Sequence, residues 1–308
     1  METELYKGRS FSGCIKAAYL LFSTNLQSIF KKMWLPSLLW AVITTGLVLV
    51  YLPDKGIHDA GMAKPWTTLI LIGCLFVGEI LADIWFMARL QCLLNGLPIR
   101  KNLKRCTILT CIFMGAGILF YFLFAGGTVL YMGQMAGKSA TIGKMAASSI
   151  AAIVLLIAIF VAVLPLQFSF VKYLVGETSR LKDAVTKDYR KGWRHWGFLL
   201  ITNFISMLII IVLSSILFIP FSIILTAQVL NQLGMLDGDP NGAPSGFFAG
   251  VIAVTVLTIF IDAFLYIWYY FVLYYAYGSI EALEKERKEL KLEQHLDFEN
   301  KSISASIS

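Results

Sequence analysis

Three carboxylates stand inside apolar stretches of the sequence, where charge is rare. Glu79 and Asp83 lie near the middle of residues 71–90, and Asp262 lies within residues 247–278. Glu79 and Asp83 are four residues apart and therefore share one face of a helix. An ionised carboxylate at the centre of a bilayer costs at least about 2.5 kcal/mol. We therefore expect at least one of the three to be protonated at neutral pH and to donate a hydrogen bond to a neighbouring helix.

Two interpretations of these acids compete. They join helices through hydrogen bonds, each worth about 0.6 kcal/mol, or they form the proton or cation site of a secondary transporter or permease. Glu79 and Asp262 lie at a similar, near-central depth in their stretches, so the three acids could meet inside the bundle. The chain has no clear inverted repeat, so the helix-joining role is favoured and transport is the alternative. Candidate partners on neighbouring stretches are Gln167, Ser169, Asn203, Ser206, Ser214 and Ser215.

Other patterns that carry chemistry are missing from the sequence. His58, His195 and His295 lie in three separate places outside the apolar stretches, and they form no HExxH motif. No GxSxG, Walker or GxGxxG element follows a strand. The five cysteines show no metal-ligand spacing, and we interpret them as reduced packing residues. The sequence therefore predicts a non-enzymatic protein with no cofactor and no metal site.

The elements that must hold the acids have the composition of membrane helices. Of the 308 residues, 58% are hydrophobic and 15% are charged, whereas soluble domains carry about a quarter of charged residues. The mean hydropathy index is +0.74. A bilayer core about 30 Å thick takes roughly 20 helical residues. Six stretches are long enough, which predicts an all-α polytopic membrane bundle of six transmembrane helices: 33–52, 67–90, 107–132, 145–174, 197–230 and 247–278.

Proline residues divide two of these predicted spans. Pro165 lies inside the fourth span and Pro220 inside the fifth. Because proline lacks an N–H and clashes with the preceding turn, each is expected to kink its helix or to end it early.

Basic residues gather in alternate connections between the spans, although the net charge is only +7. By the positive-inside rule this pattern places both termini in the cytoplasm. The cations form short clusters between apolar stretches, which does not predict nucleic-acid binding. We expect them to meet anionic lipid headgroups, at about 1 kcal/mol per basic residue. The predicted headgroup contacts are Arg100, Lys101, Lys104, Arg105, Lys182, Lys187, Arg190, Lys191 and Arg194.

Basic amphipathic segments precede spans one, three and five, near residues 11–33, 98–105 and 180–194. The chain is thus predicted to repeat, three times, a unit of one surface helix and two spans. Residues 1–278 form one membrane domain, and residues 279–308 form a charged cytoplasmic helix with a disordered end. Anchoring by acidic lipid headgroups in general is favoured over a specific docking site for lipid or protein, and the sequence specifies no protein partner.

Aromatic and charged residues near the end of span six support two further predictions. The Trp and Tyr residues between Tyr266 and Tyr277 are expected to form an interfacial belt. Beyond them, Glu281 with Lys285 and Glu284 with Lys288 have the spacing of ion pairs that stabilise a helix in water.

Two runs of sequence share a recurring pattern of basic amphipathic helix, tryptophan and membrane span. They are VKYLVGETSRLKDAVTKDYRKGWRHWGFLLITNFISMLI, which starts at Val171, and FSGCIKAAYLLFSTNLQSIFKKMWLPSLLW, residues 11–40. The pattern resembles the membrane domain attached to some glycerophosphoryl diester phosphodiesterases, and related uncharacterised six-span bacterial families. The resemblance implies architecture without chemistry, because residues 279–308 are too few for a phosphodiesterase domain. Together with the first span and the abundant basic residues, it suggests a multi-pass protein of the bacterial plasma (inner) membrane. As its role, we expect a non-enzymatic protein that organises lipid or partner proteins.

Overall fold

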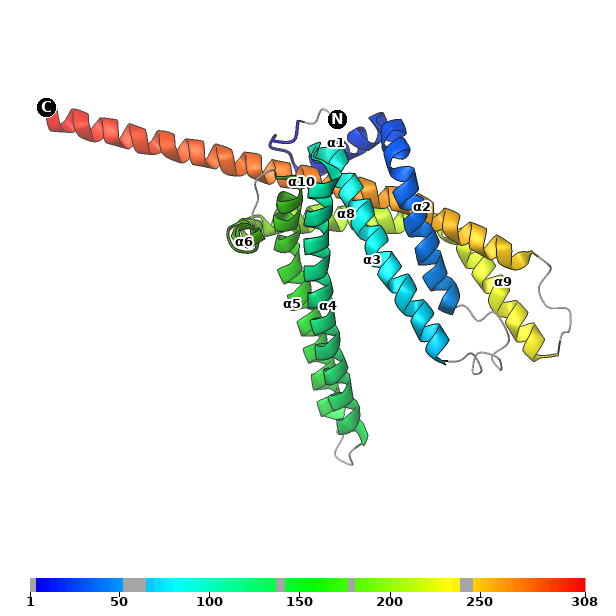
Figure 1. The fold of residues 1–308 in the computed structure, drawn as a ribbon. Helices are drawn as coiled ribbons and strands as arrows, with labels where there is room; N and C mark the ends of the chain where they lie inside the picture. The colour runs from blue at the N-terminus through cyan, green and yellow to red at the C-terminus, as the bar shows by residue number, and fades with distance from the viewer. Residues whose placement is uncertain (1–3, 52–64, 137–141, 177–180, 239–245, 308) are drawn as a thin grey trace.

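The computed structural model describes residues 4–51, 65–136, 142–176, 181–238 and 246–307. Within these ranges the regular structure is entirely helical (Figure 1). The elements follow in the order α1 (Phe11–Thr24), α2 (Leu26–Tyr51), α3 (Pro65–Asn95), α4 (Ile99–Ala136), α5 (Ile142–Val175), α6 (Leu181–Asp183), the π-helix η1 (Ala184–Asp188), α7 (Tyr189–Arg194), α8 (Trp196–Leu217), α9 (Ile219–Leu236) and α10 (Phe247–Ile307).

Five helices contain stretches that are long and apolar enough to cross a membrane: α2, α3, α5, α8 and α10. They carry predicted spans one, two, four, five and six, so the chain is a multi-pass membrane protein. The remaining predicted span, 107–132, lies on α4, and its side chains from residue 119 onward are outside the described residues. The count of six spans therefore stays a prediction.

The two prolines affect their helices differently. α8 ends at Leu217 and α9 begins at Ile219, so the predicted break beside Pro220 is confirmed. Pro220 stands in the first turn of α9, where a missing N–H leaves no helical hydrogen bond unmade. Pro165 lies inside α5, which continues to Val175.

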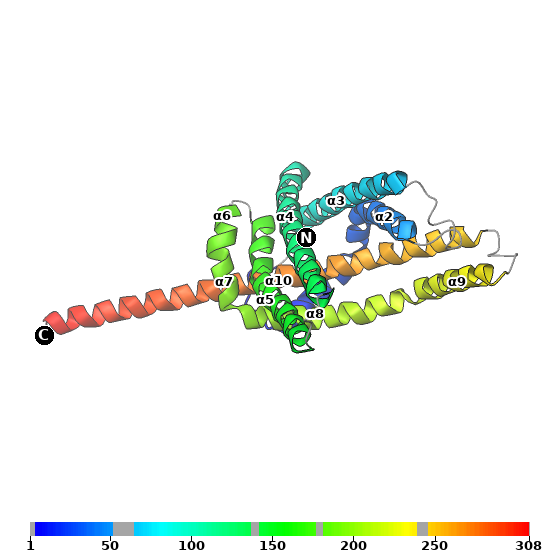
Figure 2. The same ribbon diagram turned by 90° about the horizontal axis from the view of Figure 1, so that it is seen from below.

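The apolar helices meet at one end of the molecule, which carries α1, α6 and α7 and which we call the inner end. From there, the α4–α5 hairpin diverges from α2, α3 and α9 in both views (Figures 1 and 2). Ile150, Val154 and Ile157 of α5 are at least 57% exposed, whereas Phe168 and Val171, nearer the inner end, are buried. The predicted bundle is therefore splayed, and its main hydrophobic clusters lie toward the inner end.

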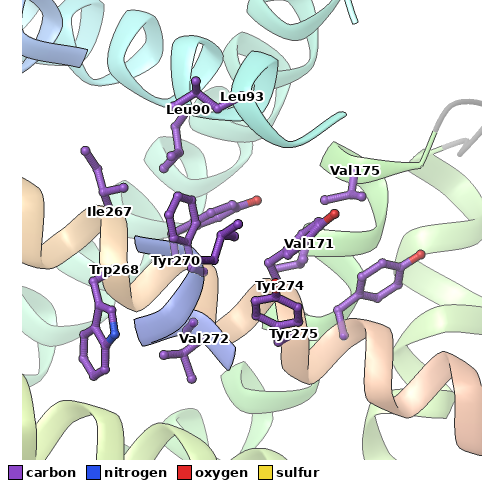
Figure 3. Close-up of a cluster of buried hydrophobic side chains, with 14 of the residues drawn as sticks. Leu90, Leu93, Val171, Val175, Ile267, Trp268, Tyr270, Val272, Tyr274 and Tyr275 are labelled. Carbon is purple, nitrogen blue, oxygen red and sulfur yellow. The ribbon is translucent and has the colours of Figure 1, made fainter. Parts of the chain in front are cut away.

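α10 is the central helix of this core and packs against α1, α2, α5, α8 and α9. Figure 3 shows Tyr270 of α10 near Leu90 of α3, and Tyr274 near Val171 of α5. Trp268, Tyr270, Tyr274, Tyr275 and Tyr277 are at most 7% exposed. The predicted interfacial belt is wrong for these residues, because other helices cover the α10 surface that would have faced lipid.

The amphipathic segments before spans one and five form helices of their own, α1 and α6–η1–α7. Residues 99–105 are instead the first turns of α4, without a separate surface helix. Ser10 caps α1 by accepting a hydrogen bond from the Gly13 N–H at 3.3 Å. α1 packs on α10 through a buried side that includes Cys14, whose Sγ lies 3.3 Å from Ser279 Oγ. Phe11 and Tyr19 of its predicted apolar face stay exposed.

The charged part of α10 projects from the rest of the chain and remains helical to Ile307 (Figure 1). Residues 301–307, predicted to be disordered, therefore continue the helix, as cooperative helix propagation allows. The predicted pairs of Glu281 with Lys285 and Glu284 with Lys288 are wrong, because both glutamates reach other helices. Lys285 instead lies 3.9 Å from Glu289.

Candidate intramembrane acids and the inner-face charge cluster

Glu79 joins α3 to α2. Its two carboxyl oxygens accept hydrogen bonds from Thr44 Oγ1 at 2.9 and 3.0 Å, and Thr44 Oγ1 also lies 2.8 Å from the Trp40 carbonyl oxygen. The threonine hydroxyl therefore bridges its own helix backbone and the acid on the neighbouring helix. The partner of Glu79 therefore lies on α2, the adjacent helix of the same hairpin.

Asp262 joins α10 to α8. Its Oδ1 accepts a hydrogen bond from Ser214 Oγ at 2.6 Å. Ser214 belongs to the predicted set of partners, but its hydroxyl donates to the acid, whereas the expected donor is a protonated acid. Nearby on α10, the Tyr269 hydroxyl donates to Asn203 Oδ1 at 2.6 Å, which makes a second polar link between the same two helices.

Asp83 makes no hydrogen bond or ion pair within the described part of the chain. It lies one helical turn from Glu79, whose charge acts on it, and it is close enough to Tyr266 of α10 and Cys106 of α4 to act on them electrostatically. Within the described ranges no hydrogen bond or ion pair joins Asp262 to either acid on α3. The structure thus places Glu79 and Asp83 on one face, as predicted, and gives Asp262 a separate partner.

A second group of charged residues lies at the inner end and connects α5, α7, the start of α8 and α10. We call it the inner-face charge cluster, and its members are Lys172, Asp188, Lys191, Arg194, His195, Glu281 and Glu284. Lys172 Nζ lies 2.8 Å from Asp188 Oδ1 and 2.7 Å from Glu281 Oε1. Lys191 Nζ lies 3.4 Å from the same oxygen of Glu281.

Glu284 is the second acid that α10 supplies to the cluster, and its side chain is 6% exposed. Its carboxylate lies 3.1 Å from Arg194 Nη1 and 2.8 Å from His195 Nε2. Residues 194 and 195 are the end of α7 and its junction with α8, so this acid fixes the turn between the two helices.

The two glutamates lie beyond the apolar part of α10, and neighbouring cations control their ionisation. Burial by itself raises the pKa of Glu281, but Lys172, through its hydrogen bond and its charge, and Lys191 hold the pKa below its ordinary value. Burial likewise raises the pKa of Glu284, and His195 and Arg194 lower it further than burial raises it. Both carboxylates are therefore charged at neutral pH, which suits their several cationic partners.

Three of the predicted lipid contacts have partners within the protein. Lys191 and Arg194 belong to the inner-face charge cluster, although the Arg194 side chain is 53% exposed, and lipid contact stays a prediction for both. Arg105 is 8% exposed and donates to the carbonyl oxygens of Leu174 at 3.3 Å and Gly176 at 2.6 Å. A cation at the C-terminal end of α5 satisfies carbonyl groups that have no helical partner.

The other six predicted cations are exposed: Arg100, Lys101, Lys104, Lys182, Lys187 and Arg190. Lys187 lies 3.8 Å from Asp183, a pair too exposed to hold much energy. Lys182 and Arg190 have no ion pair or hydrogen bond among the residues that the structure describes. These two cations stand beside the exposed apolar side chains of Val185 and Trp193.

Sequence reasoning missed Lys172, Glu281 and Glu284 as members of one cluster. A signal existed, because the acids on α10 follow a predicted cytoplasmic span end and face the same compartment as the basic connection before span five. Charge complementarity would have paired the acids of α10 with the basic connection before span five. Helix spacing instead favoured the pairs of Glu281 with Lys285 and Glu284 with Lys288.

The fold and these sites define an all-helical, multi-pass membrane protein with polar links between its spans and a charge cluster at its inner end. No family model, curated protein or solved structure matches the chain. The resemblance to the membrane domain of glycerophosphoryl diester phosphodiesterases therefore stays a prediction.

Proposed function

We propose that the chain is a non-enzymatic protein of the bacterial inner membrane, with six spans and both termini in the cytoplasm, that organises anionic lipid at its inner face. The observation that carries this proposal is the two-sided character of the segment α6–η1–α7. One side is fixed to the protein, and the other presents exposed cations beside apolar side chains.

The protein side of this segment is closely packed. Asp188 is 5% exposed and pairs with Lys172. The Tyr189 hydroxyl donates to the Ala162 carbonyl oxygen of α5 at 3.4 Å, and the Trp196 indole N–H, just beyond α7, donates to the Val161 carbonyl oxygen at 3.2 Å. The segment is thus held in one orientation against α5.

The opposite side has the composition of an interfacial helix. Val185 and Trp193 are 50% and 44% exposed, and Lys182 and Arg190 lie among them. Apolar side chains of this kind insert at the boundary of the acyl chains, while the cations attract anionic headgroups. Because the protein fixes the segment, the cations are presented together at one depth.

The intramembrane acids support a structural role in this proposal. Glu79 and Asp262 each accept a hydrogen bond from a hydroxyl on the next helix, α2 for one and α8 for the other. Such links fix which helix faces meet. They hold the spans that carry the inner end, and they do not by themselves form a transport site.

The test is lipid binding by delipidated protein in mild detergent, titrated with phosphatidylglycerol or phosphatidylcholine and followed by native mass spectrometry. The wild-type protein is expected to prefer phosphatidylglycerol. Lys182→Gln with Arg190→Gln should weaken that binding by up to about thirtyfold, since each cation contributes about 1 kcal/mol near an anionic surface. The matched control is Lys288→Gln with Lys291→Gln, which removes two exposed cations from the projecting part of α10.

Equal binding of the two lipids by the wild-type protein would contradict the proposal. The same would follow if the control variant lost as much binding as the α6–α7 variant.

A further inference from the structure

A hollow of about 420 Å³ lies between the inner ends of α2 and α3. Its cations are Lys31 and Lys32 from α2 and Arg89 from α3. None of the three has an ion pair with an acid in the described parts of the chain, and the residues that line the hollow include no carboxylate. Three positive charges thus face one cavity without compensation.

Two tryptophans and two apolar residues complete the walls, namely Trp34, Trp85, Leu35 and Pro36. The guanidinium carbon of Arg89 lies 5.9 Å from the centre of the Trp85 ring. This separation is at the outer limit of a cation–π contact, and such a contact leaves the guanidinium N–H groups available to an acceptor. Arg89 therefore lies beside Trp85 in the wall of the hollow.

The chemistry of this hollow matches a phosphate ester. Guanidinium binds two phosphate oxygens at once, and lysine ammonium groups contribute as point charges. Tryptophan favours the boundary between headgroups and acyl chains. Trp34 and Leu35 are 44% and 48% exposed, so the apolar rim of the hollow is open to the side. A ligand with a phosphate head and an apolar tail satisfies both parts.

We infer that this hollow binds the phosphodiester headgroup of one anionic phospholipid, with Arg89, Lys31 and Lys32 on the phosphate and the acyl chains passing over Trp34 and Leu35. This inference deepens the proposed function, and it rests on the inner end facing anionic lipid. It adds a defined site on residues separate from the exposed face of α6–η1–α7.

The experiment titrates delipidated protein with phosphatidylglycerol. Native mass spectrometry then measures how much of this lipid the protein binds and retains. The wild-type protein is expected to keep one phosphatidylglycerol more tightly than the rest. Arg89→Gln, and separately Lys31→Gln with Lys32→Gln, should weaken that one binding event by about tenfold or more. Arg89→Lys keeps the positive charge but lacks the guanidinium that can bind two phosphate oxygens at once. It should therefore weaken binding, but less than Arg89→Gln does. The control remains Lys288→Gln with Lys291→Gln.

Folding is checked in each variant by its thermal unfolding midpoint, and the two variants lie on different helices, so a folding defect in one leaves the other informative. Unchanged retention in both would overturn the site. Displacement of the lipid by millimolar inorganic phosphate would also overturn it, because the ligand would then be a free anion.

The failure of this site is distinguishable from failure of the proposed function. If the wild-type protein shows no preference for phosphatidylglycerol, the proposed function fails and the site fails with it. If the preference persists and depends on Lys182 and Arg190 alone, only the site between α2 and α3 is refuted.

Discussion

Glu281 forms ion pairs with lysines from two helices, and these pairs hold the helices together at the inner end. Lys172 of α5 and Lys191 of α7 both approach its Oε1. The Glu281 side chain is 20% exposed, so water screens these pairs less than it screens a pair on an open surface. The interactions of Glu79 and Asp262 are simpler, because each acid is hydrogen-bonded to one hydroxyl from one neighbouring helix.

Glu281→Gln is expected to lower the free energy of unfolding by about 1–3 kcal/mol, because two lysines lose the charge of a shared partner. The measurement is the thermal unfolding midpoint in detergent at neutral pH. Glu286→Gln, one or two turns along the same helix on an exposed residue, is the control and should leave the midpoint unchanged. A shift of equal size in both variants would show that the cluster is not the cause.

The pH dependence of the same variant follows from the lowered pKa of Glu281. A carboxylate whose pKa is lower in the folded state stabilises the protein above its unfolded pKa of about 4.3, and that stability is lost as the pH falls through the folded pKa. The wild-type protein should therefore exceed Glu281→Gln in stability at neutral pH, and the difference should shrink below about pH 4. A difference that stays constant into acid would refute the assignment.

At the scale of elements, α7 crosses α5 at a point that only glycine permits. A Cβ atom on Gly192 would lie 2.7 Å from the carbonyl oxygen of Pro165 and 2.9 Å from its Cα. Both are backbone atoms, so the neighbour cannot yield as a flexible side chain does. This crossing brings Lys191 and Arg194 within reach of the acids on α10.

Gly192→Ala is expected to push α7 away from α5 and to lower the free energy of unfolding by about 1–3 kcal/mol, as overpacking does in cores. Thermal unfolding checks the stability, and proteolysis of residues 176–194 checks whether the segment has detached. Gly197→Ala is the matched control, because a Cβ there meets nothing within 4 Å and alanine favours the helix. If Gly192→Ala matches the control, the close crossing is not important for docking.

At the scale of the whole molecule, the described helices converge at the inner end and diverge away from it (Figures 1 and 2). α10 passes through the convergence and continues as the projecting helix. This arrangement places α1, the start of α4 and α6–η1–α7 at one end, which is the placement that the positive-inside rule requires if all three face the cytoplasm.

Reporter fusions test this topology directly. Fusions within residues 95–98 and 177–180 should report a cytoplasmic location, and fusions within 52–64, 137–141 and 239–245 should report the opposite side, because each apolar stretch reverses the side. An enzyme reporter active only outside the cytoplasm, paired with one fluorescent only inside, gives complementary signals. Opposite locations for the 95–98 and 177–180 fusions would exclude the proposed orientation.

The sequence by itself determined which stretches are apolar enough to form membrane helices. A run of about 20 apolar residues favours hydrocarbon over water without any contact with distant residues. It also located the break beside Pro220, which depends on local chemistry, and it gave Ser214 as one of six candidate partners of the acids without assigning it to Asp262. Only the tertiary structure decided which cations pair within the protein and which stay exposed. Lys187 and Lys191 are one turn apart on the same basic segment, yet one is exposed and the other reaches Glu281, some 90 residues away. Periodicity shows that a helix face is polar or apolar, but what covers that face depends on helices that pack there after folding.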